Sequence, residues 1–454
     1  MTPPESLLNP PRGAARRTVV VGAGTAGHRV AAQLAAAGGG GADDGSEITV
    51  LGEEQCSPYN RVLLAEVLAG RYTPEVAALP SLTGPIVLRR GVRAVRIDRR
   101  QRRVLCDDGS VERYDDLVLA TGSNPVLPPL RGLFDDSRTG AERHQLPDGV
   151  HAFRTMDDCA ALDALLRAGG GGTRAVVVGG GLLGVSAARA LAARGVPTML
   201  AHQGEHLMER QLDPASAALL AAHLESLGVE IHTECRVRSI RTSAAGRSVT
   251  GVELADGYRL DVDLLVLACG VRPRVGLAAA AGLAVRRGVV VDDRLRTDDP
   301  RIRAVGDCAE HRGVSYGLAG PALEQADLLA RMLAEPERAA DPERAADPQP
   351  ERQAGVLRYD GSRLLTRLTL PGTPGLDLAA FGDPGEVKPD DHVLQLADGT
   401  RRAYRKLVVR DDHLVGGILL GDLATVGDLA QAWSADTVLD TPPLHLLTTH
   451  GGHS

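Results

Sequence analysis

The chain has 454 residues, which is too many for one compact core and predicts two or three domains. Its net charge of −7 and its 2% of aromatic residues argue against a protein that binds nucleic acid. No apolar run is long enough to cross a bilayer, so we expect neither a membrane anchor nor a membrane partner.

The first predicted elements follow a short lead. Residues 1–16 contain proline and arginine but no apolar core, so we expect a disordered segment rather than a secretory signal. Residues 18–21 are a β-branched run that predicts a strand, residues 28–37 have helical spacing, and residues 47–51 predict a second strand. This order, with glycines after the first strand, is typical of the βαβ unit of a parallel sheet.

The glycines fit the dinucleotide motif GxGxxG at residues 22–27. Gly22 permits a tight turn, Gly24 lets the backbone approach a pyrophosphate, and Gly27 allows close packing of helix on strand. The amides at the helix N-terminus favour an anion. Glu53 lies at the end of the second strand, where an acid bonds the ribose. A lone GxGxxG is often only a tight turn, but here strand, helix and acid all accompany it.

The same pattern occurs a second time. Two strands at residues 174–178 and 197–201 flank a helix at residues 185–193. The turn between the first strand and the helix carries the three motif glycines, Gly179, Gly181 and Gly184. The sequence therefore predicts a second dinucleotide site.

The second site has a histidine where the first has an acid. His202 follows the strand at the position where a carboxylate would bond the ribose of NAD and repel the extra phosphate of NADP. A histidine removes that repulsion without adding a permanent cation. The alternative is a solvent-exposed loop histidine with no role, so the sequence leaves NADH and NADPH open.

An internal repeat supports two related domains. Residues 104–125 and 252–273 each read as a strand, an Asp-Gly turn, a return strand and an apolar strand that ends in small residues. Each repeat follows one of the glycine motifs. We therefore expect an α/β protein with two Rossmann-like, doubly wound nucleotide-binding domains.

A third signal is the strand that ends at Gly306 and Asp307. Ligands of open α/β sheets bind at this edge, where the Asp307 carboxylate could accept a hydrogen bond from a ribityl hydroxyl. The alternative is that Asp307 caps the following segment. The residues alone do not separate these two interpretations.

The remaining segments are peripheral. Residues 135–149 are a polar connector, and PERAAD occurs twice within residues 336–347, in a linker expected to be disordered or loosely helical. We expect a small α+β C-terminal domain over residues 353–454. Its predicted strands and helix are 357–370, 393–396, 407–409 and 424–433.

The six cysteines form no CxxC pair, and none follows Cys308. This usage fits a cytoplasmic compartment, and no metal site is expected. Buried thiols that act as small apolar residues are the simplest interpretation. Cys56 lies three residues after Glu53, and we interpret it as structural or incidental.

Several segments resemble the two-dinucleotide-binding flavoproteins, which include ferredoxin and rubredoxin reductases. They look closer still to the flavoprotein part of assimilatory NAD(P)H nitrite reductase large subunits. The resemblance covers roughly residues 17–335 and is weaker beyond. The segments that carry it are AGHRV (26–30), PYNRVLLAEVLAG (58–70), ATGSNPVLPP (120–129), GGGLLG (179–184), HLMERQLD (206–213), CGVRPR (269–274), VGDCAEH (305–311) and YGLAGPALEQA (316–326).

The resemblance implies an FAD domain over residues 17–150 and 272–335, interrupted by an NAD(P) domain over residues 151–271, with a linker at 336–352. It implies hydride transfer from NAD(P)H to FAD and electron release to a redox partner protein. The residues it assigns to FAD are Gly22, Gly24, Gly27, Glu53, Arg61, Thr121, Gly122, Gly306 and Asp307. Those it assigns to NAD(P)H are Gly179, Gly181, Gly184 and His202.

Two departures concern the nicotinamide end. Many relatives have a lysine where this chain has Glu66, and a glutamate where it has Ser186. No certain catalytic side chain is predicted, because the flavin carries the chemistry, and Glu66 and Ser186 are the possible catalytic residues. If the usual residues pair, both partners are changed here.

The expected pathway is nitrate or nitrite assimilation, with a nitrite or nitrate reductase subunit or a small iron–sulfur protein as acceptor. Because iron–sulfur clusters need cysteine ligands, we do not expect this sequence to reduce nitrite by itself. An NADH-rubredoxin or ferredoxin reductase is the first alternative. A non-catalytic flavin-bearing assembly subunit or redox sensor is the second, and a homodimer is left open.

Overall fold

The computed structural model describes residues 16–37, 47–134, 145–169, 172–244, 248–334 and 357–439. Residues 1–15 of the expected lead, the PERAAD repeat and residues 135–144 of the polar connector lie outside the described residues. The chain divides into two compact units. The first comprises Met1–Arg61, Ala77–Asn124 and Arg272–Ser362, and the second comprises Val62–Val76, Pro125–Val271 and Arg363–Ser454.

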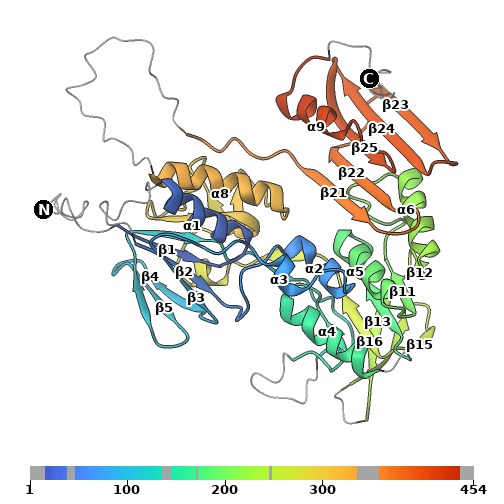
Figure 1. Ribbon diagram of the computed structural model, residues 1–454, viewed down its shortest axis with the longest axis horizontal. Coiled ribbons are helices and arrows are strands. Elements are labelled where there is room, and N and C mark those ends of the chain that lie inside the picture. Colours follow the sequence, from blue (N-terminus) through green and yellow to red (C-terminus); the bar gives the residue numbers. More distant parts are fainter. Residues whose placement is uncertain are drawn as a thin grey trace, which may run out of the picture. The chain divides into compact units, whose positions relative to one another are not determined.

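The first unit is built on a five-stranded parallel sheet (Figure 1). Helix α1 (Thr25–Ala37) connects the central strand to its neighbour, as the sequence predicts, and lies beside helix α8 (Ala319–Ala334). In sheet order the strands are β19 (Ile302–Ala304), β7 (Asp116–Leu119), β1 (Arg17–Val21), β2 (Glu47–Gly52) and β3 (Ile86–Arg90).

The core of this unit forms where the β-branched run of β1 meets the two helices. Val20, Val30 and Leu329 are completely buried within it. Each such side chain contributes roughly 1.5–3 kcal/mol through removal from water. Because all five strands are parallel, their carboxyl ends lie at the same edge of the sheet.

The second unit repeats this topology. Its parallel sheet has β10 at the centre, with α5 (Leu182–Ala193) as the connection from β10 to β11. In sheet order the strands are β12 (Val229–His232), β11 (Thr198–Ala201), β10 (Ala175–Val178), β16 (Leu264–Leu267) and β9 (Val150–His151). The predicted strands and helices of both glycine units are confirmed.

The internal repeat is also confirmed. In the first unit β4 (Ala94–Asp98), β5 (Arg103–Cys106) and β6 (Val111–Arg113) form an antiparallel sheet. In the second unit β13 (Val237–Thr242), β14 (Val249–Leu254) and β15 (Arg259–Asp261) do the same. Each sheet leads into an apolar strand that pairs with the strand before the glycine turn of its unit, β7 with β1 and β16 with β10.

Shorter elements complete the two nucleotide folds. In the first unit they are the 3-10 turn η4 (Gly306–Cys308), α7 (Gly276–Ala280), β18 (Val289–Val291) and β20 (Ala309–His311). In the second they are α2 (Leu64–Leu68), α4 (Met156–Ala168) and α6 (Pro214–Ser226). Four elements contain a boundary between the units, namely η2 (Arg61–Leu63), α3 (Pro74–Ala77), β8 (Ser123–Pro125) and β17 (Val271–Pro273). Among the described helices none is long and apolar enough to span a membrane.

The C-terminal part of the second unit is one antiparallel sheet with helix α9 (Val426–Ala435) against it. Its strand order is β21 (Leu365–Leu370), β22 (Leu376–Gly382), β25 (His413–Leu420), β24 (Ala403–Arg410) and β23 (His392–Asp398). This agrees with the expected α+β domain. Strand β22 has no counterpart among the predicted elements, although its interior is buried.

One predicted strand is wrong over half its length. Residues 357–364 are not in a sheet, and only residues 365–370 form β21. The apolar side chains there have another explanation. Tyr359 is buried in the core of the first unit, where its hydroxyl accepts a hydrogen bond from Gln325 at 3.1 Å. Side-chain anchoring, rather than a strand ladder, therefore accounts for the pattern.

A buried histidine predicts acid sensitivity in the second unit. His223 on α6 is 2% exposed, and neither ring nitrogen has a hydrogen-bond partner among the described residues. Burial lowers its pKa from 6.5, and Arg402 and Arg189 lower it further. The contribution of the neutral His223 ring to the free energy of unfolding is therefore complete above pH 6.5. It is lost as the pH falls through the lowered pKa of the folded state.

We expect the free energy of unfolding to fall less steeply below pH 6.5 in His223→Leu than in the native protein. Urea denaturation at a series of pH values measures this slope. His392→Leu, at an exposed position on β23, is the control. Equal slopes in all three proteins would contradict the assignment.

Candidate dinucleotide-binding sites

The first glycine turn joins β1 to α1, and two of its glycines are required by the fold itself. Gly22 has a φ of 113°, and a Cβ there would lie 2.1 Å from the carbonyl oxygen of Ala120. A Cβ on Gly27 would lie 1.9 Å from the carbonyl oxygen of Gly22. Any side chain at either position would therefore collide with backbone.

Gly24 differs from the other two. A Cβ there would meet nothing within 4 Å, so packing within the chain does not require glycine. The position opens the N-terminus of α1, whose amides can donate to an anion. A backbone that must approach a pyrophosphate explains this glycine, and the turn therefore fits the expected FAD.

This difference predicts a selective loss of cofactor. We expect Gly24→Ala to fold as stably as the native protein but to bind FAD at least about tenfold more weakly, because the added methyl enters the space of the phosphates. Flavin absorbance per chain after dialysis measures retention, and thermal unfolding of the apoprotein controls for folding. Full flavin retention would contradict the assignment.

Glu53 lies just after β2, at the sheet edge expected for the ribose. Its carboxylate forms two hydrogen bonds with the guanidinium of Arg274, at 2.5 and 3.2 Å. The backbone of Arg274 is held in turn, because its N–H donates to Gly122 and its carbonyl accepts from the Thr121 hydroxyl at 2.8 Å. Thr121, Gly122 and Glu53 are thus brought together by a residue that sequence reasoning did not assign to the site.

Arg61 lies in a cluster of acids. It donates to Glu54 at 2.8 Å, and the Tyr59 hydroxyl donates to the same carboxylate at 2.8 Å. Although burial lowers the pKa of Arg61, the charges of Tyr59, Glu54 and Asp307 raise it overall. The guanidinium is therefore a permanent cation near Asp307.

Asp307 is held at the end of β19. Its carboxylate accepts from the Ser123 hydroxyl at 2.8 Å, and the N–H of Gly306 donates to Gln325 at 2.8 Å. Asp307 lies inside η4, and the N-cap position of that turn is Val305. A carboxylate at this edge is suited to bond a ribityl hydroxyl.

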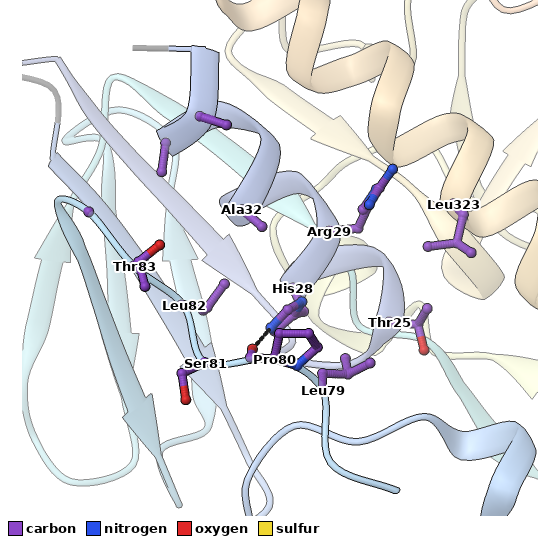
Figure 2. A pocket seen from close by; sticks show the side chains of 13 residues that line it. Thr25, His28, Arg29, Ala32, Leu79, Pro80, Ser81, Leu82, Thr83 and Leu323 are labelled. Atoms are coloured by element: carbon purple, nitrogen blue, oxygen red, sulfur yellow. Dashed lines mark hydrogen bonds between the residues drawn. The ribbon is translucent and has the colours of Figure 1, made fainter. Parts of the chain in front are cut away.

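A pocket of about 490 Å³ lies along α1 (Figure 2). His28 is among its lining residues, with Nε2 2.8 Å from the Pro80 carbonyl oxygen, and Arg29, also in the lining, pairs with Asp327 of α8. Thr25 is the only member of the first glycine turn in its lining. The pocket therefore flanks the candidate FAD site and does not contain it.

The second glycine turn reproduces the geometry of the first. Gly179 has a φ of 112°, and a Cβ there would lie 2.4 Å from the Ala268 carbonyl oxygen. A Cβ on Gly184 would lie 1.7 Å from the carbonyl oxygen of Gly179, whereas one on Gly181 would meet nothing within 4 Å. The middle glycine again leaves room for a pyrophosphate at a helix N-terminus.

His202 is not the exposed loop histidine of the alternative interpretation. Its side chain is 15% exposed, and its Nδ1 accepts from the Gly180 N–H at 3.1 Å. Burial lowers the pKa of His202, although Glu209 raises it in part. The ring is therefore a neutral support for the glycine turn. The prediction that it meets NAD(P)H stays a prediction.

Glu66 and Ser186 do not pair with each other. The Ser186 hydroxyl donates to the Leu182 carbonyl within its own helix at 2.8 Å. Glu66 of α2 instead binds Arg189 of α5 at 2.5 Å, and Arg71 at 3.2 Å. Arg189 is only 3% exposed. A buried ion pair therefore fastens α2 to the helix of the second glycine turn.

Five of the six cysteines, Cys106, Cys159, Cys235, Cys269 and Cys308, lack the surroundings of a reactive thiolate. Burial raises the pKa of Cys159 to about 12 and that of Cys269 to about 11. Burial also raises the pKa of Cys106, Cys235 and Cys308. Because a nucleophilic cysteine needs a lowered pKa, these five thiols are structural.

Comparison with known proteins agrees with this geometry. Residues 16–326 match the family described as pyridine nucleotide-disulphide oxidoreductase, and residues 373–434 match the rubredoxin NAD+ reductase C-terminal domain. In the solved complex of putidaredoxin reductase with putidaredoxin, one chain is 25% identical, with a TM-score of 0.78 and 96% of both chains covered.

The curated relatives differ in how much of their own length this chain covers. The nitrite reductase (NAD(P)H) of Bacillus subtilis is 33% identical, covering 90% of this chain but 46% of that protein. The assimilatory nitrate reductase electron transfer subunit of the same organism is 33% identical, covering 83% and 44%. A probable ferredoxin reductase of Castellaniella defragrans is 32% identical, covering 88% and 97%. The chain thus spans less than half of the nitrite and nitrate reductase relatives.

Proposed function

The chain belongs to the pyridine nucleotide-disulphide oxidoreductase family, and from this premise we propose that it passes electrons from NAD(P)H through FAD to a separate protein in nitrate or nitrite assimilation. It is an FAD-dependent NAD(P)H oxidoreductase of two Rossmann-like folds. The observation that carries the proposal is the pair of glycine turns, each with a middle glycine whose Cβ would meet no atom of the chain within 4 Å, which leaves space for a pyrophosphate.

The first turn would hold FAD and the second NAD(P)H. Arg61 and Asp307 would place a cation and an acceptor at the flavin end, and Glu53 with Arg274 would face the adenosine end. The expected domain boundaries, 17–150 with 272–335 for FAD and 151–271 for NAD(P)H, are part of this proposal. When bound, FAD supplies the redox chemistry, since it can accept a hydride and release electrons to an acceptor.

The residues of the chain supply binding and orientation. Amides at the N-termini of α1 and α5 would neutralise the two pyrophosphates. The bond from Ser123 holds the Asp307 carboxylate as an acceptor. The structural character of the buried thiols argues against a dithiol step, so electrons would leave for the acceptor directly.

The relatives support the pathway by analogy only. Those named nitrite reductase and assimilatory nitrate reductase electron transfer subunit favour assimilation. The match to the rubredoxin NAD+ reductase C-terminal domain favours the second candidate, a ferredoxin or rubredoxin reductase. For either function the expected compartment is the cytoplasm, and a homodimer is left open.

The test of the acceptor is a comparison of turnover. With NADH or NADPH as donor, we expect a nitrite or nitrate reductase subunit, or a small iron–sulfur protein, to be reduced much faster than oxygen or a quinone. Absorbance of the reduced acceptor under anaerobic conditions measures the rate. Oxygen or a quinone reduced far faster than any such protein would overturn the proposal.

A further inference from the structure

In βαβ nucleotide folds, the residues after the second strand contribute to the choice between NAD and NADP, and in the second unit these residues follow β11. In a βαβ nucleotide fold the adenosine ribose lies beyond the end of the second strand, which here ends at Ala201. His202 stands where an acid usually binds the ribose. Its neutral ring instead accepts a hydrogen bond from the Gly180 N–H. If selection between NADH and NADPH occurs, another residue of this loop must provide it.

The loop folds back onto the glycine turn. The N–H of Met208 donates to the Gly180 carbonyl at 2.9 Å, and a Cβ on Gly180 would meet Leu207 at 2.7 Å. Residues 202–209 therefore form a loop, and residues at both of its ends bond Gly180 of the second glycine turn. The residue after Met208 is Glu209.

The Glu209 carboxylate lies against the backbone of this loop. One oxygen accepts from the N–H of Glu205 at 2.8 Å, and the other lies 3.9 Å from Nε2 of His202. A Cβ on Gly204 would be 2.3 Å from that carboxylate, so glycine there lets the acid sit against the backbone. The side chain is 43% exposed and can still meet a ligand.

We propose that Glu209 replaces the missing acid at the end of β11 and makes this protein select NADH over NADPH. The inference rests on the proposed function, because it assumes that the second glycine turn binds the donor. The carboxylate would accept from a ribose hydroxyl of NADH and repel the 2′-phosphate of NADPH. The neighbouring Arg210 offers the alternative, a preference for NADPH, since its exposed guanidinium could bind that phosphate.

The test is direct binding, which does not depend on turnover. ADP-ribose and 2′-phospho-ADP-ribose are titrated calorimetrically into the holoprotein. We expect ADP-ribose to bind at least about tenfold more tightly, the size of one partly exposed charge pair. Glu209→Gln keeps an oxygen to accept from Glu205 but removes the charge, and should narrow the preference about tenfold. Glu225→Gln, exposed on α6, should leave the preference as it is.

The outcomes separate the two proposals. Tighter binding of the 2′-phosphate compound, or an unchanged preference in Glu209→Gln, would overturn the role of Glu209 while leaving the donor site intact. Loss of the preference for the 2′-phosphate compound in Arg210→Gln would then show that Arg210 binds this phosphate. Binding of neither compound, together with no flavin bleaching by either nucleotide, would overturn the proposed function itself.

Discussion

Replacing Gly181 with alanine is expected to raise the dissociation constant for NAD(P)H at least about tenfold while leaving FAD and the fold in place. The backbone at Gly181 has φ −77°, which alanine adopts without strain, and its Cβ would meet no atom of the chain within 4 Å. Only a ligand that approaches this backbone can be affected. Fluorescence titration of the holoprotein with NADH and NADPH measures the change.

The matched comparison is Gly184→Ala. Its Cβ would lie 1.7 Å from the Gly179 carbonyl oxygen, so the turn itself must distort and the yield of folded protein should fall. If Gly181→Ala behaved in the same way, or bound both nucleotides normally, the space at Gly181 would not be a pyrophosphate site.

Neutralising Glu66 is expected to lower the free energy of unfolding of the second unit by about 3 kcal/mol, because it leaves the charge of Arg189 buried without its partner. Glu66→Gln preserves the shape of the side chain and removes only the charge. Urea denaturation at fixed FAD concentration measures the loss. The same variant tests whether α2 needs this pair to stay on α5.

Two controls accompany it. Arg71→Gln removes the second, 45% exposed partner of Glu66 and should cost less than about 1 kcal/mol. The double variant Glu66→Leu with Arg189→Met removes both charges and should recover most of the lost stability, since apolar residues of similar volume can replace a buried ion pair. A double variant less stable than Glu66→Gln would contradict this account.

Local patterns were sufficient to predict much of the fold. Both glycine turns, their flanking strands and helices, and the repeated hairpins depend on residues close together in the chain, where spacing and β-branching act directly. Family, fold class and cofactors are confirmed by the comparisons. The individual cofactor-binding residues remain predictions, although the space at Gly24 and Gly181 supports the two glycine turns.

The side-chain partners could not be predicted in the same way. Arg274 reaches Glu53 across 221 positions, and Arg189 reaches Glu66 across 123, so only the folded chain brings these charges together. The substitutions at Glu66 and Ser186 are visible in the sequence, but nothing local indicates that the partner of Glu66 lies one helical turn beyond Ser186. His202 illustrates the same limit, because its position at the strand end does not reveal that its ring turns under Gly180.

The most direct test of hydride transfer is anaerobic mixing of the purified flavoprotein with NADH and, separately, with NADPH, followed by flavin absorbance. We expect rapid bleaching, faster with NADH, and slower bleaching at low nucleotide concentration in Gly181→Ala. Bleaching by neither nucleotide would mean that the second glycine turn is not a working donor site, and would favour a non-catalytic flavin-bearing subunit or redox sensor.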